Sequence, residues 1–232
     1  MTGVLQTLGL GLGVFSVIGW GWAETALSQP SETSSPAISL SWQRIREFFS
    51  QENDDPGSGG NHGSRPPVGL CLVSPRQGET LWHRNPVMVW QGYATVGVRL
   101  QGDGETVLWK ETASEPETDV YRAYYQGEQL QLGEEYEWLF YIISQGSPAI
   151  WFPFEVMAAD MYEQHAAELA ALQSELEAEG ADEEAIALAR ANYFLDNGLS
   201  SDALQAVFAV GEPSEALLET RAALVEEICA IE

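Results

Sequence analysis

The chain has 232 residues, of which 45% are hydrophobic and 10% aromatic, and this is the composition of a folded protein rather than a disordered one. The formal net charge of −25 gives a surface that repels phosphate backbones, so we expect a protein that does not bind nucleic acid. Residues 158–232 carry most of this charge, with 17 acidic residues and two arginines. The simplest interpretation of the acidic excess is solubility, and the alternative is an acidic recognition face.

Residues 1–28 predict a secretory signal peptide or an N-terminal anchor. The first 23 residues contain no charged side chain and are mostly apolar, and we expect cleavage after Ala23 or Ser28. The apolar run also approaches the roughly 20 residues that cross a bilayer, so membrane attachment through an uncleaved segment is the alternative. Either outcome predicts an exported protein of the periplasm or the cell envelope.

Residues 29–67 predict a linker that contains one short amphipathic helix over residues 41–49. The linker sequence on both sides is rich in Ser, Pro and Gly and has no hydrophobic period. Between these flanks, apolar residues recur at helical spacing, namely Trp42, Ile45, Phe48 and Phe49. A helix this short is not stable alone, so we expect it to dock against the rest of the protein.

Residues 68–157 change to the period of two that is typical of β-strands. Seven short strands are predicted, over residues 70–73, 86–91, 96–101, 105–110, 119–125, 135–143 and 150–156. Leu132-Gly133 followed by Tyr136 is typical of a tyrosine corner, in which the tyrosine hydroxyl bonds to upstream backbone. We therefore predict an immunoglobulin- or fibronectin-III-like antiparallel β-sandwich domain.

Residues 158–232 show the apolar period of helices, and we predict four of them in an acidic α-helical domain. Breaks are expected near Gly180, Gly198 and Pro213. Candidate N-caps are Ser200, Ser201 and Ser214. The helices would form a small bundle or a pair of hairpins, so the predicted fold class is α+β with segregated parts.

No motif for catalysis stands out in the sequence. It lacks a nucleophile elbow, a set of metal ligands at metal spacing and a cofactor-binding loop, so we expect no enzymatic activity and no cofactor. His83 lies in a predicted loop, where we expect a structural or solvated imidazole, and His165 lies on an apolar helix stripe as a core residue. Glu135 and Glu137 share one face of a strand, and we interpret this pattern as a solvated outer face; the alternative is an acid/base pair for glycan chemistry.

Aromatic residues are unusually frequent in the predicted sandwich, and some of them are candidates for ligand stacking. We single out Trp109, Tyr125 and Trp151, because the phase of their strands leaves their direction open. On one exposed sheet face they would stack on sugars or on aromatic side chains of a peptide, and core packing is the alternative.

Cys71 and Cys229 are the two cysteines of the chain. In an oxidising compartment they are candidates for a disulfide that joins the last helix to the first strand. The alternative is two separate buried thiols.

Several sequence segments resemble a known family. They are the run from Arg65 to Cys71, the Pro86-x-x-x-Trp90 segment, the Leu132–Trp138 segment and the Asp202-Ala203 pair. Together they resemble a group of exported cyanobacterial proteins catalogued as domain of unknown function nine hundred and twenty-eight. The resemblance covers residues 65–210 and implies export and a sandwich followed by helices, but no activity.

Three functional hypotheses follow from the sequence. The favoured one is a non-enzymatic exported binding or scaffold protein, whose partner is another protein or an envelope glycan. The second is a carbohydrate-binding module that uses the sandwich aromatics. The third is a glycan-acting hydrolase built on Glu135 and Glu137.

Overall fold

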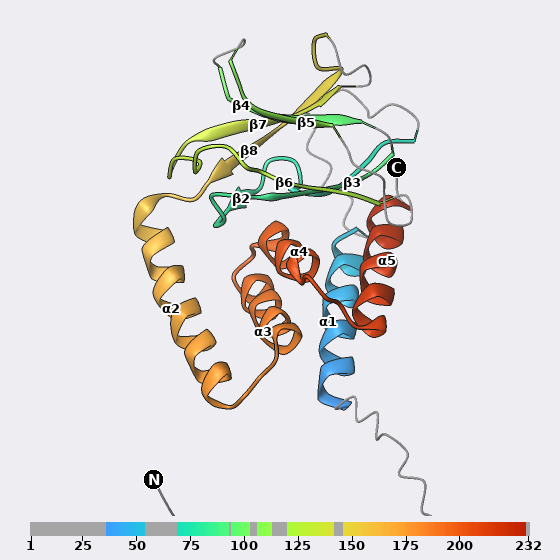
Figure 1. The fold of residues 1–232 in the computed structure, drawn as a ribbon, viewed down its shortest axis with the longest axis vertical. Helices are drawn as coiled ribbons and strands as arrows, with labels where there is room; N and C mark the ends of the chain where they lie inside the picture. The colour runs from blue at the N-terminus through green and yellow to red at the C-terminus, as the bar shows by residue number, and fades with distance from the viewer. Residues whose placement is uncertain are drawn as a thin grey trace, which may run out of the picture. The chain divides into compact units, whose positions relative to one another are not determined.

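The computed structural model describes residues 36–53, 69–92, 94–102, 106–112, 120–141 and 146–230. The predicted signal peptide or anchor, residues 1–28, lies outside the described residues. Contacts between Cα atoms place Ser34–Glu232 in one compact unit. This unit contains a β-rich region followed by four helices, so the predicted order of an α+β fold with segregated parts is confirmed at this level (Figure 1).

The strands of the described residues form two sheets. The three-stranded sheet, which we call sheet A, has the order β1 (Cys71–Ser74), β3 (Val87–Gln91), β6 (Val120–Tyr124). The five-stranded sheet, sheet B, has the order β2 (Thr80–Leu81), β8 (Ile150–Val156), β7 (Glu135–Tyr141), β4 (Thr95–Leu100), β5 (Val107–Thr112).

Each of the seven predicted strands has a counterpart, but the sequence did not predict β2. This strand has two residues and pairs with β8 in parallel, so the sheets are not purely antiparallel. Every other strand pair is antiparallel.

A first hydrophobic core fills the space between the two sheets. It exists because strands β7 and β8 alternate, so that every second residue faces sheet A, for example Trp138 on β7 and Phe152 on β8. Sheet A contributes Met88 and Trp90, both 0% exposed. The indole of Trp90 meets that of Trp138 edge to face, with ring centroids 6.3 Å apart.

The predicted tyrosine corner is confirmed. Tyr136 is 3% exposed, and its hydroxyl accepts a hydrogen bond of 2.8 Å from the backbone N–H of Gln131. The turn between them uses Gly133, whose φ of +76° is accessible to glycine at little cost. The Tyr136 side chain therefore anchors the backbone segment that leads into β7.

Five helices make up the rest of the described structure. They are α1 (Pro36–Asn53), α2 (Ala159–Ala178), α3 (Glu183–Asp196), α4 (Ser200–Ala209) and α5 (Glu215–Cys229). The predicted cap Ser214 is confirmed, because its hydroxyl accepts from the N–H of Leu217 at the start of α5. Ser200 and Ser201 are not caps: Leu199 holds the N-cap position of α4 and the two serines lie inside its first turn.

The helices cover the face of sheet A that points away from sheet B, which makes sheet A a middle layer (Figure 1). Val87 and Val89 of β3 belong to this second core, together with side chains from α3, α4 and α5. Helix α1 packs against α3 and α5 through the buried Trp42, Ile45 and Phe49. The predicted short helix therefore docks as expected, and it is longer than predicted.

Candidate functional site

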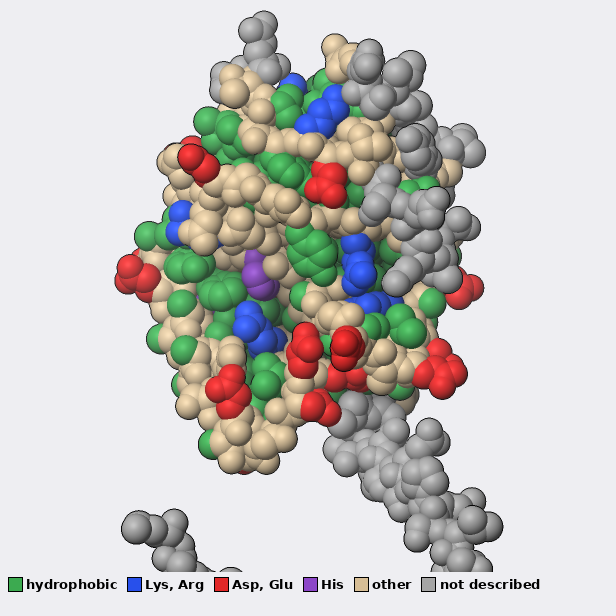
Figure 2. Space-filling view, viewed as in Figure 1, with side chains coloured by type: hydrophobic (Ala, Val, Ile, Leu, Met, Phe, Trp, Pro, Cys, Tyr) green, Lys and Arg blue, Asp and Glu red, His purple; other side chains and the backbone are tan. Residues whose placement is uncertain are grey.

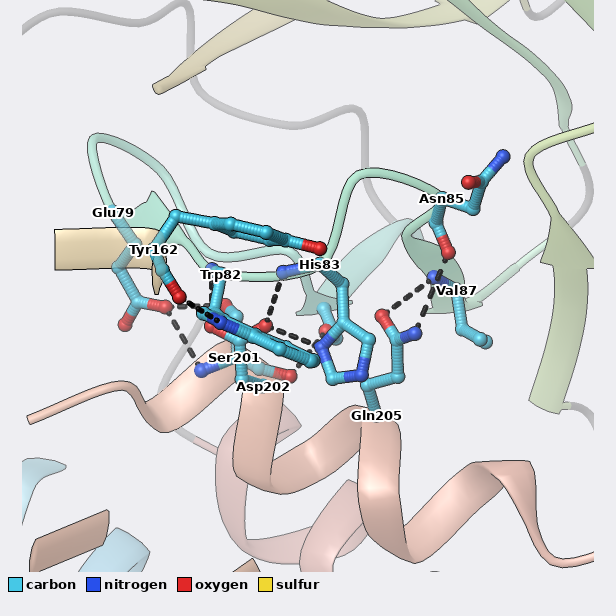
Figure 3. A network of polar contacts seen from close by, with 10 residues as sticks. Glu79, Trp82, His83, Asn85, Val87, Tyr162, Ser201, Asp202 and Gln205 are labelled. Atoms are coloured by element: carbon cyan, nitrogen blue, oxygen red, sulfur yellow. Dashed lines mark hydrogen bonds and ion pairs between the residues drawn. The ribbon is translucent and has the colours of Figure 1, made fainter. Parts of the chain in front are cut away.

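The most concentrated polar site in the described residues joins α4 to the segment between β2 and β3. Its centre is Asp202, whose side chain is 1% exposed. One carboxylate oxygen accepts the backbone N–H of Trp82, and the other accepts the backbone N–H of His83, both at 2.9 Å. The same carboxylate pairs with Nδ1 of the His83 imidazole (Figure 3). Asp202 thus fixes both the backbone and the imidazole of a segment about 120 positions away in sequence.

A second carboxylate extends this network to the start of α4. Glu79 accepts hydrogen bonds from the hydroxyls of Ser200 and Ser201 and from the backbone N–H of Ser201 at 3.1 Å. The Ser201 hydroxyl in turn accepts from the N–H of Arg76 at 2.9 Å. This explains why two serines are buried in the first turn of α4: they bind the loop before β2 instead of capping their own helix.

Aromatic rings pack around the network. The Trp82 indole stacks on Tyr162 of α2 at 5.3 Å between centroids, and its Nε1–H donates to the Tyr162 carbonyl. The His83 ring meets Trp82 edge to face at 4.9 Å and lies 5.4 Å from the ring of Phe194 on α3. A segment of the β region and two helices, α2 and α3, therefore meet at these rings.

The imidazole of His83 reaches the surface, as the side chains of Arg76 and Glu79 in the same network also do. Its side chain is 17% exposed, and its Nε2 makes no hydrogen bond with any described residue. Arg190 on α3 lies close enough for Asp202 to influence its pKa; burial lowers that pKa, and the Asp202 charge opposes the effect. An imidazole oriented by a buried carboxylate can accept, donate or transfer a proton at Nε2.

The described residues contain no group of three or more His, Cys, Asp or Glu side chains that could hold a metal ion. His83 has Asp202 behind it, as many metal-binding histidines do, but it lacks companion ligands in this part of the chain.

The predicted stacking residues do not form one surface. Trp109 and Tyr125 meet each other edge to face at 5.6 Å, and Tyr125 is 4% exposed in the core between the sheets. Trp151 points to the opposite, outer face of sheet B and is 47% exposed. The guanidinium of Arg99 lies 5.5 Å from the Trp151 ring centroid. The strand alternation that places Trp109 inward places Trp151 outward.

Cys71 and Cys229 form a disulfide in the structure, with their Cα atoms 5.7 Å apart. The bond ties the first residue of β1 to the last residue of α5. Of the two alternatives left open by the sequence, the structure contains the bonded one.

The carboxylates of the predicted hydrolase pair have different surroundings. Glu137 forms an ion pair with Arg99 on the neighbouring strand, where both side chains are mostly buried. Glu135 is exposed and lies opposite Glu155 of β8. Both face outward from sheet B, and the pairing of Glu137 with Arg99 gives that carboxylate a structural role.

The sequence did not predict the Asp202 site, although it placed His83 correctly in a loop and His165 correctly in a buried stripe. One sequence signal was available: Asp202, a charged residue, lies among the apolar residues of α4. Such a residue indicates a buried partner without identifying it.

Comparisons with known proteins add no assignment to this site. No protein-family model matches the chain, and no curated protein matches it. Among the described helices, none has the length and apolar character needed to cross a bilayer.

Proposed function

We propose that this chain is a non-enzymatic, exported binding or scaffold protein of the periplasm or cell envelope. Its two sheets would form an immunoglobulin- or fibronectin-III-like platform, and its helices would meet the partner. Membrane attachment through residues 1–28 and a relationship to the exported cyanobacterial family named above belong to the same proposal.

The observation that carries the proposal is the exposure of α2. Of its 20 residues, only His165 and Leu169 are buried. The remaining apolar residues of its inner stripe, Leu172 and Leu176, are only partly buried, and Met161 is 44% exposed. Helices of globular proteins gain most of their stability from packing an apolar face. A long helix with so little of it buried is therefore suited to receive a second surface.

The charge of this region indicates the character of the partner. Helix α2 contains five acidic residues and no lysine or arginine. On the face drawn in Figure 2, acidic side chains gather over the helices rather than over the sheets. A partner with a basic surface would associate faster and more selectively than a neutral one.

Affinity capture of the mature protein from its own envelope tests the proposal. We expect one stoichiometric protein partner, and we expect Met161→Asp to reduce its recovery at least about tenfold. Leu218→Asp is the matched control, because Leu218 is 46% exposed on α5 and the substitution adds the same charge. Equal recovery with both variants, or no partner at all, would contradict a partner site on α2.

Glycan binding is the second candidate function, and the exposed Trp151 favours it. One face of its ring lies against Arg99, whose partner Glu137 is a hydrogen-bond acceptor, so aromatic and polar groups adjoin on the outer face of sheet B. Sugars bind to such surfaces by stacking on the ring and bonding to the polar groups. Glycan-array binding that Trp151→Ala abolishes would favour this function over the first. A glycan-acting hydrolase has less support, because Glu137 is occupied by Arg99.

A further inference from the structure

We propose that His83 and Arg190 together bind the carboxylate group of a small acidic ligand. We call this place the His83–Arg190 site. The inference does not depend on the partner proposed for α2.

The geometry brings the two side chains to the same part of the surface. Arg190 precedes Phe194 by one helical turn on α3, and residues four apart lie on one face of a helix. The Phe194 ring lies 5.4 Å from the ring of His83. The face of α3 that carries Arg190 is therefore the face that meets His83. In Figure 2 a histidine side chain lies near the middle of the drawn face with basic side chains near it, and other basic side chains lie elsewhere on this face.

Arg190 is a cation that forms no ion pair with an acidic side chain among the described residues. The side chain is partly buried, and it makes no hydrogen bond or ion pair with any described residue. Burial lowers the pKa of Arg190, and Asp202 is the acid that acts against this effect from a distance. Desolvating a cation without a direct partner costs free energy, and an anion bound by the guanidinium recovers it. A planar carboxylate suits the two parallel N–H donors of the guanidinium.

His83 supplies the second contact. Asp202 already accepts two backbone N–H groups, so it acts as the acceptor toward Nδ1, and the imidazole carries a proton on that nitrogen. Nε2 then faces the surface without a partner among the described residues. Protonated at Nε2, the imidazole donates to a bound oxygen, and Asp202 stabilises its positive charge.

The charges of the site select a monoanion. The charged groups that act on the site are Asp202 from α4 and Arg190 from α3; in the segment of His83 itself, Arg84 donates to the Leu130 carbonyl and Glu79 accepts from Ser200 and Ser201. With the imidazole protonated, His83 and Arg190 exceed the Asp202 carboxylate by one charge. One carboxylate neutralises this excess, whereas a phosphate dianion would leave a surplus negative charge. The site therefore favours the protonated imidazole over the neutral one when it holds a carboxylate.

The test is titration of the folded, isotope-labelled protein with sodium acetate, followed by NMR of the histidine ring and arginine Nε signals. Acetamide is the neutral control of the same shape. At pH 5.5 we expect acetate, but not acetamide, to shift the His83 and Arg190 signals to saturation. His165, which is 4% exposed and bonded to Tyr193, is the internal control and should not shift.

Variants separate the site from a general charge effect. Arg190→Gln should abolish the acetate shifts, and Arg190→Lys, which keeps the charge, should weaken binding at least about tenfold. Arg46→Gln removes the same charge from an exposed position on α1 and should leave binding unchanged. Equal shifts with acetamide, or unchanged binding in folded Arg190→Lys, would overturn the proposal. Tighter binding of dihydrogen phosphate, the main form of phosphate at pH 5.5 and a monoanion like acetate, would overturn the choice of a carboxylate. Met161→Asp, which should disrupt partner binding to α2, should leave the acetate response unchanged. A failure of the His83–Arg190 site can therefore be distinguished from a failure of the proposed partner surface.

Discussion

Cys229 closes α5 directly against Cys71 at the start of β1, and the bond between them spans 158 positions of sequence. A crosslink over so long a loop removes much of the conformational freedom of the unfolded chain. We expect Cys71→Ser to lower the free energy of unfolding by about 4 kcal/mol, measured by denaturant unfolding. The double variant Cys71→Ser/Cys229→Ser should match the single one, because both lose the same bond. A wild-type midpoint that reductant does not change would refute this role of the disulfide.

Asp202 should be the most sensitive acidic residue of the helices. Asp202→Asn removes the charge that accepts two backbone N–H groups and the imidazole of His83, and we expect a loss of about 3 kcal/mol of stability. Asp196→Asn is the matched control. Its ion pair with Arg44 is more than half exposed on both sides, so its loss should cost less than about 1 kcal/mol. Thermal unfolding of both variants measures the difference, and similar losses would show that the network is not a structural centre.

Helix α1, which precedes the sheets in sequence, contributes buried side chains to the core that the helices form with sheet A. Trp42 is 2% exposed, and we expect Trp42→Ala to cost about 4 kcal/mol in chemical unfolding. Trp151→Ala deletes the same side chain at a position that is 47% exposed, and it should cost less than about 1 kcal/mol. If the two variants were equally stable, α1 would not be part of the cooperative unit.

Removing the hydrogen bond of the tyrosine corner should lower the stability less than the substitutions described above. Tyr136→Phe keeps the ring and removes the hydroxyl that accepts from Gln131, and we expect a loss of about 1 kcal/mol. Tyr124→Phe, at a position that is 43% exposed, should leave the unfolding midpoint unchanged. An equally small effect of both changes would mean that the corner does not stabilise the sandwich.

The contact between α2 and α3 should depend on pH. The Tyr193 hydroxyl donates to Glu168 and lowers the pKa of that carboxyl, with a further contribution from Gln164. A lowered pKa in the folded state adds stability above the ordinary pKa of Glu, near 4.5, and this stability is lost as the pH falls. Burial, followed by the Glu168 contact, raises the pKa of Tyr193, so its contribution is present below pH 10 and is lost above it.

We therefore expect wild type to lose more stability than Tyr193→Phe between pH 7 and pH 3. Urea unfolding across this range measures the difference, and parallel curves for the two proteins would contradict the assignment. Tyr162→Phe is a control for the loss of a hydroxyl on the neighbouring helix.

The strands and helices followed from local patterns, and the exceptions have physical reasons. Alternation identified β7 and β8, because each has one face in the core. Strand β2 was missed, because two residues contain no period and its position depends on pairing with β8. The serines of α4 were expected as caps, because a cap is a local interaction, whereas Glu79 reaches them from more than 120 positions away.

The difference between local and long-range interactions also explains why the sequence did not predict the candidate site. Asp202 and His83 are 119 positions apart, and neither has a neighbour in sequence that predicts the other. Trp109, Tyr125 and Trp151 were grouped because the phase of their strands was open in the sequence, whereas their sheet positions in the structure separate them. Long-range pairs between single residues leave no pattern in one sequence.

The packing of α1 against α5 has a consequence for biogenesis. Among the described elements, α1 is synthesised first and α5 last, yet they pack side by side in one core. This core cannot close while α5 is still inside the ribosome or a translocation channel. Completion of the helical layer therefore waits until α5 has emerged and can pack against α1.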